Sequence, residues 1–492
     1  MTTPLDIPVP ADTETAEVDG LVERAAAASA SWRSSSIADR VRALDAVANA
    51  LDARADDLVA VAGDETHLAE ARLRGELTRT TFQLRLFGEV LQEGSWLDVR
   101  IDHAVADYPM GAPRPDLRRQ LEAIGPVVVF AASNFPFAFS VAGGDTASAL
   151  AAGNAVVLKA HHGHPRLSAL TGEIVSGALD ASGAPAGLFS LVYGTDAGVR
   201  ALQAPAVKAA SFTGSIAGGR ALFDIAAARP EPIPFYGELG SVNPAFVTRS
   251  AAAGRAAEIA EQFVASVTGS AGQLCTKPGV LLVPRGSEIV DALGAATLPG
   301  AAPLLNGGIA AGFRASFERV SGHEGVQALA GSLGDGDAPA PALLRTSAAA
   351  ILADPDAFVS EMFGPAALIA EYDDESELVA VAAVLEGQLT ATIAGSDDDA
   401  IAPRLMSVLA TKAGRVLWNQ WPTGVSVTWA QQHGGPYPAT TSVGSTSVGT
   451  AALSRFLRPV AYQNVPDALL PEALREANPL GIPRRVDGVL QA

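Results

Sequence analysis

The stretch GPVVVFAASNFPFAFSVAGGDTASALAAGNAVVLKA, residues 125–160, decides the fold of this chain. It begins with a short β-rich run, continues through an Ala-rich helical segment and ends in a second β-rich run, NAVVLKA. A further helical segment and the run LFSLVYG (188–194) continue the alternation. Such alternation indicates βαβ units, in which helices cover a parallel sheet. The sequence therefore predicts a nucleotide-binding α/β domain.

Two other regions flank this alternation. From about Thr15 to Leu91, apolar residues recur at three- and four-residue spacing, which predicts a helical N-terminal layer. A second alternation of β-rich and helical runs extends from SVNPAFV (241–247) to GRVLWNQ (414–420), so we expect the main domain boundary near Gly240. Residues 434–446 are rich in Gly, Pro, Ser and Thr and should form a loop. The run ALSRFLRPVAYQ (452–463) is typical of a short helix followed by an extended arm.

The composition limits what the chain can bind. Its 492 residues, 48% of them hydrophobic, can fill more than one core, so we expect two or three domains. A net charge of −19 repels phosphate backbones and anionic membranes, which argues against nucleic acid and membrane partners. The opening residues lack a secretory pattern, and no apolar run reaches the roughly 20 residues of a membrane-spanning helix. We therefore expect a cytoplasmic protein.

The single cysteine is the first candidate for chemistry. One cysteine excludes an intramolecular disulfide and a cysteine-based metal cluster, and we expect no metal. Cys275 lies in GSAGQLCTKPGVLLV (269–283), between small residues and a β-like run, on a turn that can expose a thiol. Taken alone, it is either a nucleophile or an inert buried thiol.

Glu238 is the candidate general base. It lies between glycines and apolar residues in PFYGELGSVNP (234–244), where partial desolvation predicts a pKa raised toward neutrality. A glutamate in a Gly-rich loop is otherwise a solvated or helix-capping residue.

Strand-end loops supply further candidates. Asn134 follows the first β-rich run, where its amide can donate to an oxyanion or simply form a turn. The segment SFTGSIAGGRAL (211–222) opens a helix after a strand, which directs backbone N–H groups toward a phosphate, although its spacing is not GxGxxG. Lys159 ends a strand and can reach a ribose or phosphate, or remain solvated.

Taken together and in order, six segments resemble the aldehyde dehydrogenase superfamily. They are SNFPF (133–137), VLKA (157–160), FTGS (212–215), ELG (238–240), GQLCTKPG (272–279) and EMFGP (361–365). This resemblance, which spans nearly the whole chain, implies an α/β fold with a Rossmann-like cofactor domain, a second α/β catalytic domain and a small oligomerisation arm.

The resemblance also implies a division of the chain. The cofactor-binding domain would comprise residues 1–104 and 124–240, and the catalytic domain residues 241–448. Residues 105–123 and 449–467 would form the arm, and residues 468–492 a C-terminal tail. By resemblance the protein is a homodimer or homotetramer in which each arm adds strands to a neighbour's sheet.

The chemistry implied by the resemblance is aldehyde oxidation. The Cys275 thiolate would add to the aldehyde, and the Asn134 amide and the Cys275 backbone N–H would hold the resulting oxyanion. Hydride would pass to NAD(P), and water activated by Glu238 would release the acid from a thioester. The cofactor-binding residues implied are Lys159, His162, Gly194, Gly214, Ser215, Leu239, Gly240, Glu361 and Phe363.

Five segments narrow the resemblance to the α-ketoglutarate semialdehyde (2,5-dioxopentanoate) dehydrogenase branch, some of whose members prefer NADP. They are ETHLAEARLRGELTRTTFQLRLF (65–87), EGSWLDVRID (93–102), PRPDLRR (113–119), RPEPIPFYGELG (229–240) and QHGGPYPATT (432–441). The last contains His433, which we expect near the thiol as a modulator; it is otherwise a structural histidine.

Two departures from the branch pattern bear on substrate and cofactor. Where branch members carry Asp-Ser-Arg after the PYPAT segment, this chain reads TTSVGSTSVGT, so an arginine facing the substrate carboxylate is missing. Arg119 or another arginine could replace it. After Lys159 the chain reads AHHGH, without the acid that holds the ribose hydroxyls of NAD. Lys159, His162 or Arg200 could offer positive charge, so NADP is the preferred cofactor and NAD the alternative.

The leading hypothesis is oxidation of α-ketoglutarate semialdehyde to α-ketoglutarate. The alternatives are oxidation of neutral or longer aldehydes, transfer of the acyl group to CoA, thiol-dependent ester hydrolysis and cofactor binding without catalysis. Retained Glu238 argues against CoA, and the intact set of Cys275, Glu238 and Asn134 argues against a non-catalytic protein.

Overall fold

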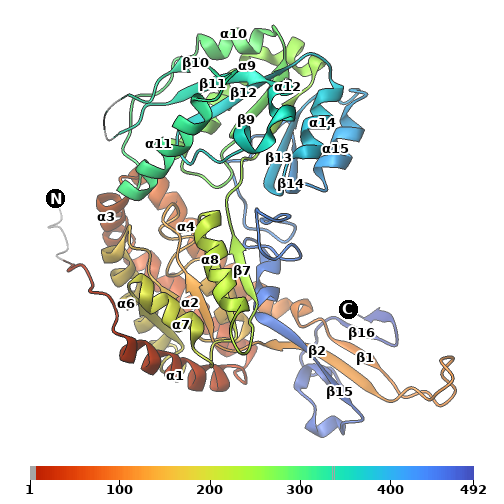
Figure 1. Ribbon diagram of the computed structural model, residues 1–492. Helices are drawn as coiled ribbons and strands as arrows, with labels where there is room; N and C mark the ends of the chain where they lie inside the picture. Colours follow the sequence, from red (N-terminus) through yellow and green to blue (C-terminus); the bar gives the residue numbers. More distant parts are fainter. Residues whose placement is uncertain (1–6, 335, 337, 492) are drawn as a thin grey trace.

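The computed structural model describes residues 7–334, 336 and 338–491. Three separate sheets organise this part of the chain (Figure 1). The first contains, in spatial order, β5 (Phe189–Val192), β4 (Val156–Lys159), β3 (Val127–Phe130), β6 (Ala209–Thr213) and β7 (Phe235–Glu238), with every neighbouring pair parallel. The chain moves outward from β3 to β5 and returns to β6 on the other side of β3. Loops leaving β3 and β6 therefore meet where the strand order reverses, the edge at which such sheets bind nucleotides.

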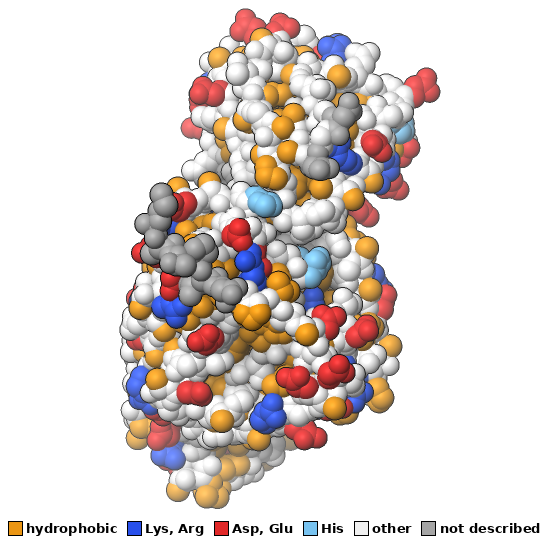
Figure 2. All heavy atoms as spheres, turned by 90° about the vertical axis from the view of Figure 1, so that its left-hand side faces the viewer, with side chains coloured by type: hydrophobic (Ala, Val, Ile, Leu, Met, Phe, Trp, Pro, Cys, Tyr) orange, Lys and Arg blue, Asp and Glu red, His pale blue; other side chains and the backbone are white. Residues whose placement is uncertain are grey.

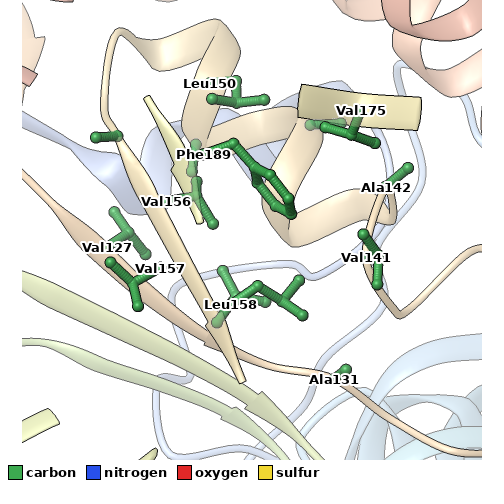
Figure 3. Close-up of a cluster of buried hydrophobic side chains, with 14 of the residues drawn as sticks. Val127, Ala131, Val141, Ala142, Leu150, Val156, Val157, Leu158, Val175 and Phe189 are labelled. Carbon is green, nitrogen blue, oxygen red and sulfur yellow. The ribbon is translucent and has the colours of Figure 1, made fainter. Parts of the chain in front are cut away.

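The predicted N-terminal helical layer is confirmed. It consists of α1 (Thr15–Trp32), α2 (Ile37–Ala53), α3 (Ala55–Thr66) and α4 (Glu70–Glu93). The helices α5 (Gly144–Ala152), α6 (Pro165–Ala181), α7 (Thr195–Gln203) and α8 (Ile216–Ala227) connect the strands of the first sheet. Valines and leucines of β3 and β4 pack with Leu150, Val175 and Phe189 in one buried cluster (Figure 3). This burial of apolar surface fixes the strands whose ends carry the site.

The second sheet lies in the other lobe of the molecule. Its order is β10 (Gln327–Gly331), β11 (Ala342–Ser347), β12 (Ala366–Tyr372), β9 (Val280–Pro284), β8 (Ala245–Val247), β13 (Gln388–Ala394) and β14 (Ala413–Trp418). All pairs are parallel except β10 with β11. The predicted β-rich runs of this region are strands, whereas the exposed edge strand β10 has no clear β pattern and was not expected.

Helices surround this second sheet. They are α9 (Arg249–Thr268), α10 (Glu288–Gly294), α11 (Gly307–Ser321), α12 (Ala348–Ala353), α13 (Pro355–Phe358), α14 (Ser376–Val384) and α15 (Ala402–Leu409). β7 of the first sheet ends at Glu238 and β8 of the second begins at Ala245, so the chain passes between the lobes through residues 239–244.

A third, projecting sheet collects segments from distant parts of the chain (Figure 1). Its order is β15 (Leu457–Gln463), β2 (Leu117–Ala123), β1 (Arg100–Asp102), β16 (Arg484–Val486) and β17 (Val489–Gln491). The C-terminal tail contributes the last two strands of this sheet, and its Leu474 and Ile482 pack in a small core with Leu97 and Ile101. Short 3-10 helices join these elements at Ser95–Leu97, Gly269–Gly272, Thr450–Phe456, Asp467–Leu469 and Glu472–Leu474. Two α/β lobes and a projecting arm confirm the predicted fold class.

The surface carries mixed charges. Figure 2 shows acidic and basic side chains intermingled over one face, with histidines near the junction of the two lobes. Within the described ranges, no helix is long and apolar enough to span a membrane.

Candidate active site

The cysteine loop is held rigidly between the two lobes. Cys275 follows the 3-10 turn Gly269–Gly272 and is partly exposed. Asn243 Nδ2 donates to the carbonyl oxygens of Cys275, at 2.8 Å, and of Lys277, at 3.0 Å. Gly272 has a φ of +70°, and a Cβ there would lie 2.1 Å from the Gly364 carbonyl oxygen. Only glycine fits this close approach, so GQLC packs directly against EMFGP.

Three residues nominated from sequence meet at the thiol. The carboxylate of Glu238 lies at the end of β7, and His433 Nε2 lies 2.9 Å from its Oε1. The same Nε2 lies 3.6 Å from Cys275 Sγ. Ser447 Oγ donates to the other Glu238 oxygen. Glu238 and His433 are buried, so water is largely excluded from this triangle. The expected nearness of His433 to the thiol is confirmed by this contact.

The structure shifts the pKa values of Glu238 and Cys275, and for Glu238 the direction differs from the sequence prediction. The predicted rise in the pKa of Glu238 is wrong: burial raises it, but the charge of His433 and hydrogen bonds from His433, Ser447 and Cys275 lower it further, so it lies below its ordinary value. Burial, then the charges of Glu238 and Glu361, raise the pKa of the Cys275 thiol well above its ordinary value. The resting pair is thus a carboxylate beside a protonated thiol, an arrangement in which Glu238 can accept the thiol proton.

Asn134 lies beside the cysteine loop. Its Nδ2 donates to the carbonyl oxygen of Gln273 at 3.2 Å. Helix α4 holds this loop: Arg72 Nη2 donates to the Asn134 carbonyl oxygen at 2.6 Å, and buried Glu76 Oε1 accepts from the backbone N–H groups of residues 137–138. Sequence reasoning missed Arg72 and Glu76 as supports, although both stand in the branch segment 65–87.

The nominated strand-end residues line the carboxyl edge of the first sheet. Lys159 ends β4, and Gly194 follows β5 with a φ of +90°. Gly214 donates its N–H to the Glu238 carbonyl oxygen at 3.0 Å. Ser215 is the N-cap of α8, and its Oγ accepts a hydrogen bond from the N–H of Gly218. The N-terminus of α8 therefore lies at this edge of the sheet.

Glu361 lies beside Gly240, two residues beyond the end of β7. A Cβ at Gly240 would lie 2.8 Å from its Oε2, and burial raises its pKa to about 7 against the opposing charge of Lys277. Lys277 Nζ donates to the carbonyl oxygens of Met362, at 2.9 Å, and Ala366, at 2.7 Å. This anchor fixes the segment that carries half-buried Phe363.

Leu239 belongs to the packing of α8. Its side chain is buried, and its Cδ2 lies 2.1 Å from where a Cβ at Gly219 would stand. Its N–H donates to the Ala439 carbonyl oxygen at 2.8 Å. The residue therefore ties β7 to the 434–446 loop.

The three cationic residues proposed to bind the cofactor differ in how much positive charge they can offer it. His162 stacks on His161 at 4.4 Å between ring centroids, and burial followed by the charge of Lys159 lowers its pKa, so it carries little charge at neutral pH. Arg200 pairs with Asp19 at 2.7 Å. Lys159 remains the principal cation of this edge, with a pKa lowered by burial.

An unexpected carboxylate stands beside Lys159. A Cβ at Gly194 would lie 2.6 Å from Asp12 Cγ, and the charge of Asp12 acts on Lys159. The Thr13 N–H donates to the Tyr193 carbonyl oxygen at 3.0 Å, which holds the N-terminal segment there. Sequence reasoning found no acid after Lys159 because this one is 147 positions earlier in the chain.

Arg119 does not reach the thiol. It lies on β2 of the projecting sheet and forms a salt bridge with Asp98 at 2.8 Å. Its suggested role as a substitute for the missing arginine is therefore wrong.

Comparison with known proteins agrees with this geometry. The profile of the aldehyde dehydrogenase family matches residues 7–306. Alpha-ketoglutaric semialdehyde dehydrogenase 2 of Azospirillum brasilense is 47% identical, covering 99% of this chain and 94% of that protein. The alpha-ketoglutaric semialdehyde dehydrogenase of Acinetobacter baylyi is 42% identical, covering 96% and 91%.

Solved structures share the fold at lower identity. The NADP-dependent glyceraldehyde-3-phosphate dehydrogenase of Bacillus halodurans, complexed with NADP, superposes with a TM-score of 0.75 at 22% identity, covering 92% of this chain and 91% of that one. The methylmalonate-semialdehyde dehydrogenase of Oceanimonas doudoroffii gives a TM-score of 0.77 at 18% identity, covering 94% and 95%. With the family profile and the two near-full-length relatives, this chain belongs to the aldehyde dehydrogenase family, oxidoreductases that act on aldehydes with NAD(P).

Proposed function

We propose that this enzyme oxidises α-ketoglutarate semialdehyde to α-ketoglutarate, with NADP as the preferred cofactor and NAD as the alternative. The observation that carries the proposal is the buried contact of His433 Nε2 with both Cys275 Sγ and Glu238 Oε1. Two relatives that cover nearly the whole chain bear the name of this activity and support the substrate.

The residues at the edge of the first sheet fit NAD(P). The N-terminus of α8 offers N–H groups to a pyrophosphate, Lys159 a cation, and Glu361 a carboxyl group for ribose hydroxyls. On this basis the unit containing the first sheet binds the cofactor and residues 241–448 carry the nucleophile. When bound, NAD(P) accepts the hydride of the aldehyde carbon.

The remaining steps belong to this chain's own groups. Cys275 Sγ adds to the aldehyde carbon as its proton passes to the Glu238 carboxylate. The Asn134 amide and the Cys275 N–H hold the oxyanion. After oxidation has left a thioester on Sγ, Glu238 releases the thiol proton to solvent, and its carboxylate then takes a proton from the water that attacks the thioester and releases the acid.

His433 has a positioning role in this scheme. Among the described residues none bonds its buried Nδ1, whereas Nε2 faces the Glu238 carboxylate at 2.9 Å. Nε2 therefore donates the hydrogen bond to the Glu238 carboxylate. His433 thus positions the Glu238 carboxylate to take a proton from the thiol and later from water.

The function is tested by initial rates of NADPH and NADH formation at 340 nm. We expect α-ketoglutarate semialdehyde to give a kcat/KM at least about tenfold above succinate semialdehyde, glutaraldehyde and hexanal. A higher value for hexanal would contradict the proposed substrate and favour the neutral-aldehyde alternative. That alternative has support from the apolar cluster of Leu86, Val427 and Val448 with Phe139, whose ring lies 6.2 Å from the His433 ring.

The cofactor preference yields a second prediction. Asp12→Asn is expected to raise the ratio of kcat/KM for NADP to that for NAD about fivefold, because it removes a carboxylate that repels a 2′-phosphate near Lys159. Glu14→Gln is the matched control, since it removes an exposed acid two positions away that makes no side-chain cap bond. An unchanged ratio in Asp12→Asn would mean that the 2′-position lies elsewhere.

We also propose a cytoplasmic homodimer or homotetramer. The unpaired Cys275 suits a reducing compartment. Val489 and Leu490 of β17 are each 65% exposed, and Leu469 in the 3-10 helix Asp467–Leu469 is 74% exposed; such apolar surface is suited to a second copy of the chain. Light scattering of the purified enzyme measures the assembly, and a monomer would contradict this proposal.

A further inference from the structure

A short oxo-acid aldehyde has an aldehyde group at one end and a carboxylate at the other. Cys275, Glu238 and Asn134 act only on the aldehyde group. Its carboxylate needs a cation at the far end of a short chain, where the sequence lacks the arginine of the branch pattern. Arg119 is engaged with Asp98 in the projecting sheet. The carboxylate therefore needs another arginine close to the thiol.

Arg79 of α4 has this position. Its guanidinium carbon lies 5.5 Å from the centre of the Phe139 ring, and that ring lies 6.2 Å from the His433 ring. His433 Nε2 in turn lies 3.6 Å from Cys275 Sγ. One aromatic ring thus separates Arg79 from the reacting group. Arg72 and Glu76, seven and three positions earlier, share this face of the helix and hold the Asn134 loop.

The neighbouring arginines are already engaged, whereas Arg79 is not. Arg72 donates to the Asn134 carbonyl oxygen and lies 3.8 Å from Glu76, and Arg415 donates to the carbonyl oxygens of Pro422 and Gly424. Across the part of the chain that the structure describes, no group accepts a hydrogen bond from Arg79 or forms a salt bridge with it. Its five donors remain available to an anion.

The surroundings of Arg79 favour an anionic ligand. Burial lowers its pKa, and the charges of Glu76, Cys275 and Glu238 act in the opposite direction, so its charge is felt at the reacting groups. A half-buried cation without a partner anion is costly, and a ligand carboxylate relieves that cost. Beside it, Phe139 with Leu86 forms an apolar wall against which methylene groups can pack.

We propose that Arg79 binds the substrate carboxylate, at the opposite end of the molecule from the carbonyl that Cys275 attacks. This inference rests on the proposed function and defines its substrate class as short aldehydes with a terminal carboxylate. It makes Arg79 a specificity-determining residue supplied by the N-terminal helical layer.

The test compares α-ketoglutarate semialdehyde with pentanal, a neutral aldehyde of the same carbon number. Arg79→Gln is expected to lower kcat/KM for the oxo-acid about 100-fold, mainly through KM, and to change that for pentanal less than about threefold. Arg79→Lys keeps the charge but loses the bidentate geometry, so a loss of about tenfold is expected for the oxo-acid alone. Arg74→Gln removes an exposed arginine of α4 that pairs with Glu70 and Asp56, and serves as the matched control.

The outcomes separate this inference from the proposed function. If wild-type enzyme prefers pentanal, the proposed substrate is wrong before any variant is made. If wild type prefers the oxo-acid but Arg79→Gln retains that preference, the anchor is elsewhere and the inference fails. Equal losses on both aldehydes in Arg79→Gln and Arg79→Lys would assign Arg79 to folding alone and also overturn it.

Discussion

Cys275→Ala is expected to abolish aldehyde-dependent NAD(P)H formation, with kcat lowered at least about 10⁴-fold. The chain has one cysteine, so no second thiol can take over. Its Sγ lies 3.6 Å from His433 Nε2, and the loop is held by the Asn243 side chain, whose Nδ2 donates to the backbone carbonyl oxygens of Cys275 and Lys277. The substitution therefore removes the nucleophile and leaves the loop's supports in place.

Cofactor binding distinguishes this result from misfolding. Quenching of protein fluorescence on adding NADPH should be the same for wild type and Cys275→Ala, because the cofactor edge does not use the thiol. Cys275→Ser is the matched control for size and should also be inactive, since a hydroxyl is a far weaker nucleophile at neutral pH. Appreciable turnover by the alanine variant would refute covalent catalysis, and a wild type that binds cofactor without turnover would support the non-catalytic alternative.

Glu238→Gln is expected to lower kcat about 100- to 1,000-fold. Glutamine keeps the shape of the side chain and its contact with Ser447 but cannot take a proton from the thiol or from water. Both addition and thioester hydrolysis should slow, and a single-turnover experiment should show slower NAD(P)H formation as well as slower steady-state release. Rapid formation with slow release would restrict Glu238 to hydrolysis and assign the thiol proton to another acceptor.

The pH profile tests the partner of Glu238. Its pKa is held below the ordinary value, so wild-type activity should fall on acidification only as pH drops through that lowered value. In His433→Gln the charge of the histidine is lost while burial remains, so the pKa of Glu238 rises and activity is lost at a higher pH. His433→Phe also loses the hydrogen bond to Glu238, so its activity should be lost at a still higher pH than that of His433→Gln. A profile unchanged in both variants would leave His433 as packing.

Local sequence was sufficient for much of the fold. The runs at β3 and β4 and the Ala-rich α5 between them have the periodicities of their elements, and the four N-terminal helices match the predicted range, with α4 ending two residues beyond it. Strand β10 was not expected because Gln-Ala-Leu-Ala-Gly has no alternating pattern, and its pairing with β11 decides its conformation. The strands of the tail became clear only through their partners in the projecting sheet.

The sequence by itself determined the family and nominated Cys275 as nucleophile and Glu238 as base, because motif order and a single cysteine are properties of the chain. Only the tertiary structure decided the direction of the Glu238 pKa, since burial and its contacts with His433 and Ser447 act in opposite senses. It alone brought Asp12 beside Lys159 and placed Arg79 where the charges of Cys275 and Glu238 act on it. The physical reason is that a residue's type is fixed by the sequence, whereas its charge state and partners depend on groups that approach only when distant segments pack together.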